Sequence, residues 1–199
     1  MRESVAAPSK NWLSATPAET EALGATLAAA IVEVRAARVG ARGDGPSARL
    51  DAGLAPGASR SVPAATGATS SDALIVVYLT GDLGAGKTTL ARGFIHAVGV
   101  TEPIRSPTYT LLETYEAPNV TVVHLDLYRL RDPDELEPLG LRDLARPSYV
   151  WLIEWAERGA GWLPSPDLEV RLAVGSEGHR IEARGVSDVG AACLSRIAA

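Results

Sequence analysis

A glycine-rich loop that ends in a lysine and two threonines is the strongest chemical signal in this sequence. Residues 81–89 read GDLGAGKTT and fit the pattern G-x-x-x-x-G-K-[ST] at every fixed position. Glycines let the backbone curl so that its N–H groups point at a phosphate, while Lys87 can reach the outer phosphates and Thr88 can ligate Mg²⁺. We therefore predict a binding site for a nucleoside triphosphate. Its residues are Gly81, Asp82, Leu83, Gly84, Ala85, Gly86, Lys87, Thr88 and Thr89.

The residues on either side of this loop supply the strand and the helix that the motif requires. Residues 74–79 are aliphatic apart from Tyr78, which is typical of a buried strand. After the loop, apolar residues recur at helical spacing up to Val98, and Gly99 provides a stop signal. The amino terminus of that helix adds unpaired N–H groups and a partial positive charge, so this context favours anion binding.

Two acidic residues stand directly after apolar segments. Asp126 follows residues 120–125 and Glu154 follows residues 149–153, and both segments are predicted strands. Ligands of open α/β sheets bind beyond the carboxyl ends of the strands, so both acids can meet the loop at one edge. Either acid suits the shell of Mg²⁺ while the other holds the attacking water, although each also fits a solvated strand end. We take Lys87, Asp126 and Glu154 as the candidate catalytic residues.

Three further side chains near these segments carry weaker signals. Thr108, in the Ser-Pro-Thr stretch that begins at Ser106, lies where many P-loop proteins sense the outermost phosphate, but an ordinary turn entering a strand is slightly favoured. Trp155 fits either stacking on a base or filling the edge of the sheet. His124 alternates within its strand and is interpreted as a packed core histidine.

Absences in the sequence favour ATP over GTP. The chain has no glutamine, so the water-orienting glutamine of many GTPases is missing, and no N-K-x-D stretch is present to read guanine. Arg92, Arg129 and Arg131 are candidates for charge stabilisation, but the pattern assigns none of them as an arginine finger.

The remaining segments complete an α/β pattern. Thr16, Pro17 and Glu19 form a helix start of the capping-box type, and this helix is predicted to end near Arg38. Further strands are predicted at 10–15, 106–115 (or an extended hairpin arm), 168–174 and 180–183, and further helices at 132–144 and 189–197. Strands separated by helices predict a P-loop NTPase-like, three-layer α/β fold with a mostly parallel central sheet flanked by helices.

We expect a single P-loop ATPase domain over residues 1–199 with two irregular segments. Residues 1–10 are predicted to form a loose leader. Residues 39–72 are rich in Gly, Pro and Ser and show no periodicity, so they are predicted to be a disordered insertion. A regulatory or partner-binding loop is the alternative for that insertion.

Composition limits the class of protein and its location. Of the 199 residues, 46% are hydrophobic and 22% are charged, which allows an ordinary core. The net charge of −5 lacks the basic excess of proteins that bind nucleic acids on their own. The single cysteine, Cys193, excludes an internal disulfide. Because the chain shows neither a signal-peptide pattern nor a long apolar run, we expect a soluble cytoplasmic protein without membrane contact.

Five stretches of the sequence, in their order and spacing, closely resemble the TsaE family, also called YjeE. They are GDLGAGKTTL, SPTYTL, HLDLYRL, DPDELEPLG and LIEWAERGAGWLP. The resemblance covers roughly residues 11–37 and 73–185, and the insertion at 39–72 departs from the family pattern. Members of this family are small bacterial ATPases needed to make N6-threonylcarbamoyladenosine at position 37 of tRNAs.

The resemblance implies ATP and Mg²⁺ as ligands and gives roles to individual residues. Lys87 would contact the phosphates, and Thr88 and Glu154 would bind Mg²⁺. Asp126 would serve hydrolysis or the outer shell of the metal. Trp155 matches the tryptophan that adjoins the metal-binding acid of the family, and the stretch from Ser106 to Tyr109 matches its switch-like segment.

The resemblance also implies a base site and protein partners. In this family the base lies near the start of the first helix, which implies Thr16, Pro17 and Glu19, and more weakly His179 or Arg180. Family members act with the TsaD–TsaB complex, which transfers the threonylcarbamoyl group. The protein would therefore meet tRNA only through that complex.

Two other functions are compatible with a P-loop. A small-molecule kinase needs an acceptor pocket and usually a mobile lid, and the region after Asp126 contains arginines but no lid-sized helical insertion. A nucleotide-binding scaffold without catalysis would have no need of Asp126 or Glu154.

Overall fold

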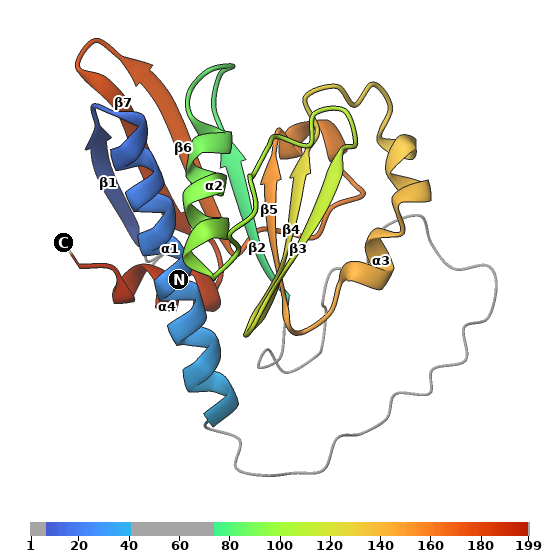
Figure 1. Cartoon of the computed structure of the whole chain (residues 1–199), viewed down its shortest axis with the longest axis horizontal. Helices are drawn as coiled ribbons and strands as arrows, with labels where there is room; N and C mark the ends of the chain where they lie inside the picture. The colour runs from blue at the N-terminus through green and yellow to red at the C-terminus, as the bar shows by residue number, and fades with distance from the viewer. Residues whose placement is uncertain (1–6, 41–73, 199) are drawn as a thin grey trace, which may run out of the picture.

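A single mixed sheet forms the centre of the protein in the computed structural model, which describes residues 7–40 and 74–198 (Figure 1). In this part of the chain, seven strands pair in the order β1-β7-β6-β2-β5-β4-β3. The strands are β1 (Ser9–Ser14), β2 (Ile75–Thr80), β3 (Leu112–Ala117), β4 (Val120–Asp126), β5 (Tyr149–Glu154), β6 (Leu168–Gly175) and β7 (Gly178–Gly185). The predictions for residues 1–6 of the leader and for residues 41–72 of the insertion lie outside the described residues.

Parallel pairing is confined to the four central strands. β2 pairs in parallel with both β5 and β6, and β4 pairs in parallel with β5. The outer pairs β1–β7, β6–β7 and β3–β4 are antiparallel. Only residues 118–119 join β3 to β4 and only residues 176–177 join β6 to β7, and such short connections allow antiparallel pairing alone. The predicted α/β fold is confirmed, with a sheet that is mixed at its edges.

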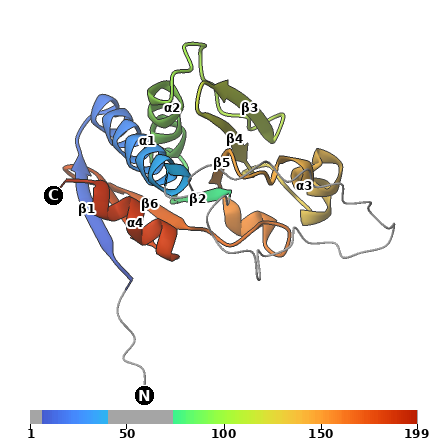
Figure 2. The same ribbon diagram turned by 90° about the horizontal axis from the view of Figure 1, so that it is seen from below.

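Helices cover both faces of the sheet and make three layers (Figure 2). The helices are α1 (Pro17–Gly40), α2 (Lys87–Ala97), α3 (Leu141–Leu144) and α4 (Asp188–Arg196), with the short 3₁₀ helices η1 (Pro133–Leu139) and η2 (Ala156–Gly159). One core joins α1, α2 and α4 to alternate residues of the strands, such as Val77 and Leu152. A second core on the opposite face joins Val76 and Trp151 to η1, α3 and η2.

Helices α1 and α2 pack closely through glycine. A Cβ atom on Gly24 would lie 2.1 Å from the carbonyl oxygen of Leu90, and one on Gly93 would lie 2.1 Å from that of Glu21. At such distances any side chain would push the helices apart, so both positions need glycine. This contact sets the position of α2, and therefore of the glycine-rich loop that precedes it.

The start of α1 confirms the predicted cap with one change of partner. The Thr16 hydroxyl accepts a hydrogen bond from the Glu19 N–H at 3.2 Å. The Glu19 carboxylate reaches back to the N–H of Ala15 at 2.6 Å, one residue before the cap residue that a capping box would use. The helix continues to Gly40, two residues beyond the predicted end, so residues 39–40 belong to the helix and not to the insertion.

Two predicted elements are wrong in their extent. The helix predicted from residue 132 to 144 is split, because Pro138 and the left-handed Gly140 (φ 63°) separate η1 from α3. Its capping box at Asp132 and Glu135 is present. The strand predicted for residues 106–115 begins only at Leu112, so residues 106–111 form a loop.

Among the residues that the structure describes, no helix combines the length and the apolar character needed to cross a lipid bilayer.

Candidate functional site

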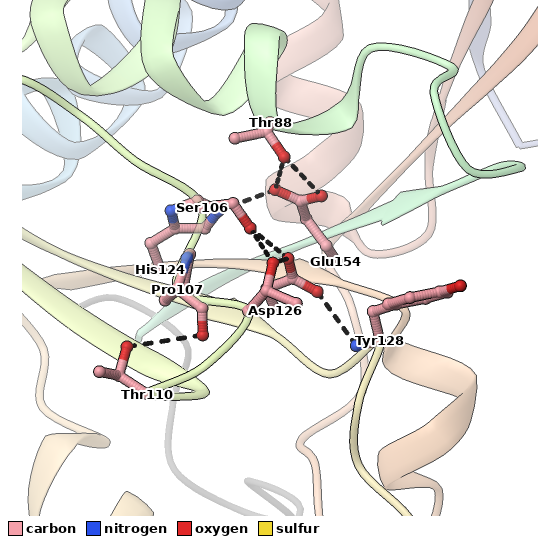
Figure 3. Close-up of polar contacts among 9 residues, drawn as sticks. Thr88, Ser106, Pro107, Thr110, His124, Asp126, Tyr128 and Glu154 are labelled. Atoms are coloured by element: carbon pink, nitrogen blue, oxygen red, sulfur yellow. Dashed lines mark hydrogen bonds and ion pairs between the residues drawn. The ribbon is translucent and has the colours of Figure 1, made fainter.

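The two predicted acids meet at the carboxyl ends of neighbouring parallel strands. Asp126 of β4 and Glu154 of β5 are register partners in the sheet. Side chains alternate along a strand, so Glu154 shares the face of Leu152, which packs in the α2 core. Asp126 likewise shares the face of Val122, which lies four residues earlier on β4 and packs in the same core. Both carboxylates therefore face the side of the sheet that α2 covers, as Figure 3 shows.

The glycine-rich loop connects β2 to the first turn of α2. Gly81 and Gly86 have φ angles of 134° and 97°, which are costly for residues with a side chain. A Cβ atom on Gly81 would also lie 2.0 Å from the carbonyl oxygen of Leu172. Of the other predicted loop residues, Asp82, Leu83 and Gly84 are exposed, Ala85 is buried, and Thr88 and Thr89 lie half-buried in the first turn of α2.

Lys87 lies over its own loop. Its side chain is 4% exposed, and its ammonium donates hydrogen bonds to the carbonyl oxygens of Gly81 at 2.7 Å and Asp82 at 2.8 Å. Burial lowers the pKa of this ammonium, while the negative charges of Glu154 and Asp126 act in the opposite direction. The positive charge is thus held at the loop by backbone oxygens, a bonding pattern that phosphate oxygens can replace.

Glu154 is buried and receives hydrogen bonds from two sides. The Thr88 hydroxyl lies 2.9 Å from Oε1 and 3.0 Å from Oε2. Nε2 of His124 lies 2.9 Å from Oε1. Only 2% of Glu154 is exposed, so water contributes little to its solvation and these neighbours hold it in place. The contact with Thr88 joins the end of β5 to the start of α2.

Asp126 accepts hydrogen bonds from a different set of residues. Its Oδ2 accepts hydrogen bonds from the hydroxyls of Ser106 and, at 2.7 Å, of Thr108. Its Oδ1 accepts the backbone N–H of Tyr128 at 3.0 Å. The carboxylate therefore ties the loop of residues 106–111 to the end of β4 (Figure 3). The two acids, equivalent in the sequence pattern, are distinct in the structure, because Glu154 contacts Thr88 and Asp126 contacts the loop.

Trp155 lies beside the glycine-rich loop. Its backbone is left-handed, with φ 60° and ψ 40°, and ends β5 directly after Glu154. The Lys87 ammonium lies 4.0 Å from the centre of the indole ring, and the ring of Tyr128 packs on it at 5.1 Å between centroids. The guanidinium of Arg158 lies 5.7 Å from the same indole ring. The tryptophan therefore joins the loop to the segment that follows β4.

Thr16 is placed at the cap of α1, where its hydroxyl is used by the helix. Thr20, one turn later, is closer to the loop, because its methyl group would lie 3.6 Å from a Cβ atom on Gly86. The ring of His179, the second residue of β7, would lie 3.1 Å from the same atom. Thr20 also shares a 2.7 Å hydrogen bond with Ser14. The region near the start of α1 thus adjoins the loop through Thr20 and His179.

Two contacts at the site were missed by the sequence reasoning. His124 is buried, as predicted, but its ring contacts Glu154, and Ser106 contacts Asp126. Strand alternation offered a signal for the first, because a residue two positions before Asp126 must share its face. No local pattern indicated the second, which depends on the path of a loop.

The donors at the site fit Mg²⁺ bound together with phosphate. The Thr88 hydroxyl and the Glu154 carboxylate are hard oxygen ligands that already lie in contact. Within residues 7–40 and 74–198, no three His, Cys, Asp or Glu side chains come together as a metal site. A magnesium ion here would therefore complete its shell with phosphate and water oxygens, which is the usual arrangement for Mg²⁺.

Comparisons with known proteins agree on one family. A family model described as "Threonylcarbamoyl adenosine biosynthesis protein TsaE" matches residues 14–182. A Haemophilus influenzae protein named tRNA threonylcarbamoyladenosine biosynthesis protein TsaE is 45% identical over 121 residues, which cover 61% of this chain and 77% of that protein. The Bacillus subtilis protein of the same name is 37% identical over 105 residues, covering 53% and 65% of the two chains.

A solved structure shares the fold. The crystal structure of Bacillus subtilis YdiB superposes on this chain with a TM-score of 0.64. The superposition covers 96% of this chain and 95% of the YdiB chain. Its sequence is 22% identical, so the likeness extends to the architecture of the sheet and helices.

Proposed function

This chain belongs to the TsaE family, and from that premise we propose that it is an ATPase acting in tRNA threonylcarbamoyladenosine biosynthesis. The names of its relatives support the place in this biosynthesis. The observation that carries the ATPase half of the proposal is the contact between Thr88, at the start of α2, and Glu154, at the end of β5. It puts a hydroxyl and a carboxylate together at the end of a phosphate-binding loop.

ATP would bind with its phosphates on the loop. The backbone N–H groups of residues 81–88 and the amino terminus of α2 supply donors and positive potential. Lys87 would exchange the carbonyl oxygens of Gly81 and Asp82 for phosphate oxygens, which carry more negative charge. The missing glutamine and the missing guanine-reading stretch favour ATP over GTP.

Thr88 and Glu154 would hold Mg²⁺, since they are the oxygen donors in mutual contact at the loop. When bound, the metal would neutralise phosphate charge during hydrolysis. Asp126 lies in the register position next to Glu154 and contacts Ser106 and Thr108 instead of Thr88. We therefore assign the direct metal contact to Glu154, and to Asp126 the orientation of the attacking water.

Hydrolysis would proceed by attack of that water on the γ-phosphorus. The P–O bond to ADP breaks, the bond to the water oxygen forms, and inorganic phosphate leaves. Asp126 would orient the water by accepting a hydrogen bond from it, and the proton that the water loses would pass to the departing phosphate. A carboxylate has about four acceptor positions, and Asp126 accepts hydrogen bonds from Ser106, Thr108 and Tyr128, so it can hold the water while its contacts to the loop of residues 106–111 remain.

The proposed partner is the TsaD–TsaB complex, which would stimulate turnover and carry the tRNA. The net charge of −5 supports an indirect role toward tRNA, because phosphate backbones are bound by basic surfaces.

The test is phosphate release in a mixture of this protein, ATP, Mg²⁺ and a TsaD–TsaB complex. We expect release that rises when the complex is added. Release that requires a phosphate-accepting metabolite and ignores the complex would instead identify a small-molecule kinase. If Lys87→Ala abolishes modification of tRNA while Asp126→Ala and Glu154→Ala leave it intact, the protein is a nucleotide-binding scaffold without catalysis.

A further inference from the structure

The imidazole of His124 is a buried polar group at the site to which the proposed hydrolysis assigns no task. It is 0% exposed, and its Nε2 lies 2.9 Å from Oε1 of Glu154. His124 stands two residues before Asp126 on β4, so it faces α2 together with both acids. A buried imidazole needs a hydrogen-bond partner, and the partner of His124 is the carboxylate that also contacts Thr88 at the end of the glycine-rich loop.

The ring nitrogen that faces Glu154 is the donor in this contact. An ionised carboxylate can only accept hydrogen bonds, so Nε2 carries a proton and donates it to the hydrogen bond with Oε1. The other ring nitrogen, Nδ1, is buried and has no hydrogen-bond partner within the described part of the chain. Among the described residues, the imidazole therefore makes its side-chain hydrogen bond to Glu154.

We propose that His124 is a positioning residue that fixes Glu154 for Mg²⁺ binding, an inference that rests on the ATPase function proposed above. Glutamate has three rotatable side-chain bonds and loses entropy when it is ordered. His124 occupies Oε1, which leaves Oε2, bonded only to Thr88 among the described residues, as the oxygen for the metal. Hydrogen bonds from behind a ligating carboxylate orient it in this way, and their loss typically weakens metal binding about 10–100-fold.

Two substitutions distinguish positioning from simple packing. His124→Leu fills a similar space without a donor, so Glu154 loses its bond at Oε1. His124→Gln places a side-chain amide nitrogen near the position of Nε2 and can still donate to Glu154. If His124 only fills the core, both variants should bind Mg²⁺ alike. If it positions Glu154, the glutamine variant should bind Mg²⁺ much more tightly than the leucine variant.

The experiment is a Mg²⁺ titration of thermal unfolding at a fixed concentration of a non-hydrolysable ATP analogue. We expect the Mg²⁺ concentration at half-maximal stabilisation to rise about tenfold or more in His124→Leu and to stay within about threefold of the wild type in His124→Gln. Stabilisation by the analogue without Mg²⁺ should be the same in all three proteins. An unchanged Mg²⁺ midpoint in His124→Leu, or an equal rise in both variants, would overturn the proposal.

The same titration distinguishes a failure of the His124 inference from a failure of the ATPase proposal. If the wild type shows no effect of Mg²⁺, the ATPase proposal and this inference fall together, whereas a normal wild type with an unchanged leucine variant overturns only the inference. If His124→Leu does not fold, nitrogen-15 NMR of the wild-type imidazole decides. We expect a proton on Nε2 of His124, the nitrogen that faces Glu154. A proton on Nδ1 alone would overturn the proposal.

Discussion

Glutamine and alanine at position 154 separate the structural role of Glu154 from its proposed role in binding Mg²⁺. The carboxylate accepts hydrogen bonds from Thr88 and His124 while almost fully buried. Glu154→Gln keeps the volume, and its amide oxygen can accept from His124 while its amide nitrogen donates to the Thr88 oxygen. Glu154→Ala removes the acceptor from both neighbours. Glu154→Gln should therefore keep the stability of the wild type and lose Mg²⁺ binding, whereas Glu154→Ala should lose Mg²⁺ binding and also part of its stability.

The contacts set the size of the effect on stability. In Glu154→Ala the His124 N–H is left buried without a partner, which costs about 1–3 kcal/mol. The half-buried Thr88 hydroxyl can turn to water and adds little. A loss of about 2 kcal/mol lowers the melting temperature of a chain of this size by about 4–8 °C. Glu154→Gln should stay within about 1 kcal/mol of the wild type, because its lost charge no longer has to be desolvated.

Thermal unfolding without nucleotide, followed by ATP titrations with and without Mg²⁺, checks both parts. We expect a melting temperature for Glu154→Gln close to that of the wild type, and ATP binding that no longer responds to Mg²⁺. A Glu154→Gln protein that melts as early as Glu154→Ala would refute the hydrogen-bonding argument. A Glu154→Gln protein with the full response to Mg²⁺ would refute the assignment of Glu154 as a metal ligand.

Two further predictions concern the core. Gly93→Ala places a Cβ atom 2.1 Å from the Glu21 carbonyl oxygen, so it should lower the free energy of unfolding by about 1–3 kcal/mol. Urea titration measures this loss. An unchanged urea midpoint would contradict the close packing of α1 and α2. Burial raises the pKa of the Cys193 thiol from 9.0 to about 12, so its contribution to stability is complete below pH 9 and is lost as the pH rises toward 12. Between pH 8 and pH 10 the wild type should therefore lose about 1.4 kcal/mol more than Cys193→Ala, and identical losses would contradict the burial of the thiol.

The sequence predicted the fold and the convergence of Glu154 on the glycine-rich loop because both depend on local patterns. A glycine-rich loop between an apolar strand and a helix has one common architecture, and acids after apolar strands converge wherever those strands run in parallel. Strand alternation then determines which face Asp126 and Glu154 share. These patterns require only neighbours in the chain, and β4 and β5 end within one residue of their predicted ends.

Other features depend on contacts between distant segments and were beyond the sequence. The different roles of the two acids follow from the hydroxyls that donate to them, which are Thr88 for Glu154 and both Ser106 and Thr108 for Asp126. The split of the predicted helix at Gly140 shows that a backbone break can override an apolar pattern. The role of Trp155 beside the loop depends on a left-handed residue that no pattern indicated.

The central claim is that the loop around Lys87 binds ATP for hydrolysis. Calorimetric titration of the protein with ATP in the presence of Mg²⁺ tests it most directly, with Lys87→Ala as the comparison and circular dichroism as the check of folding. We predict saturable binding of one ATP by the wild type and binding about 100-fold weaker by the variant, since a charged hydrogen-bond donor is worth about 2–3 kcal/mol. A wild-type protein that does not bind ATP, or a folded Lys87→Ala variant that binds it equally well, would contradict the claim.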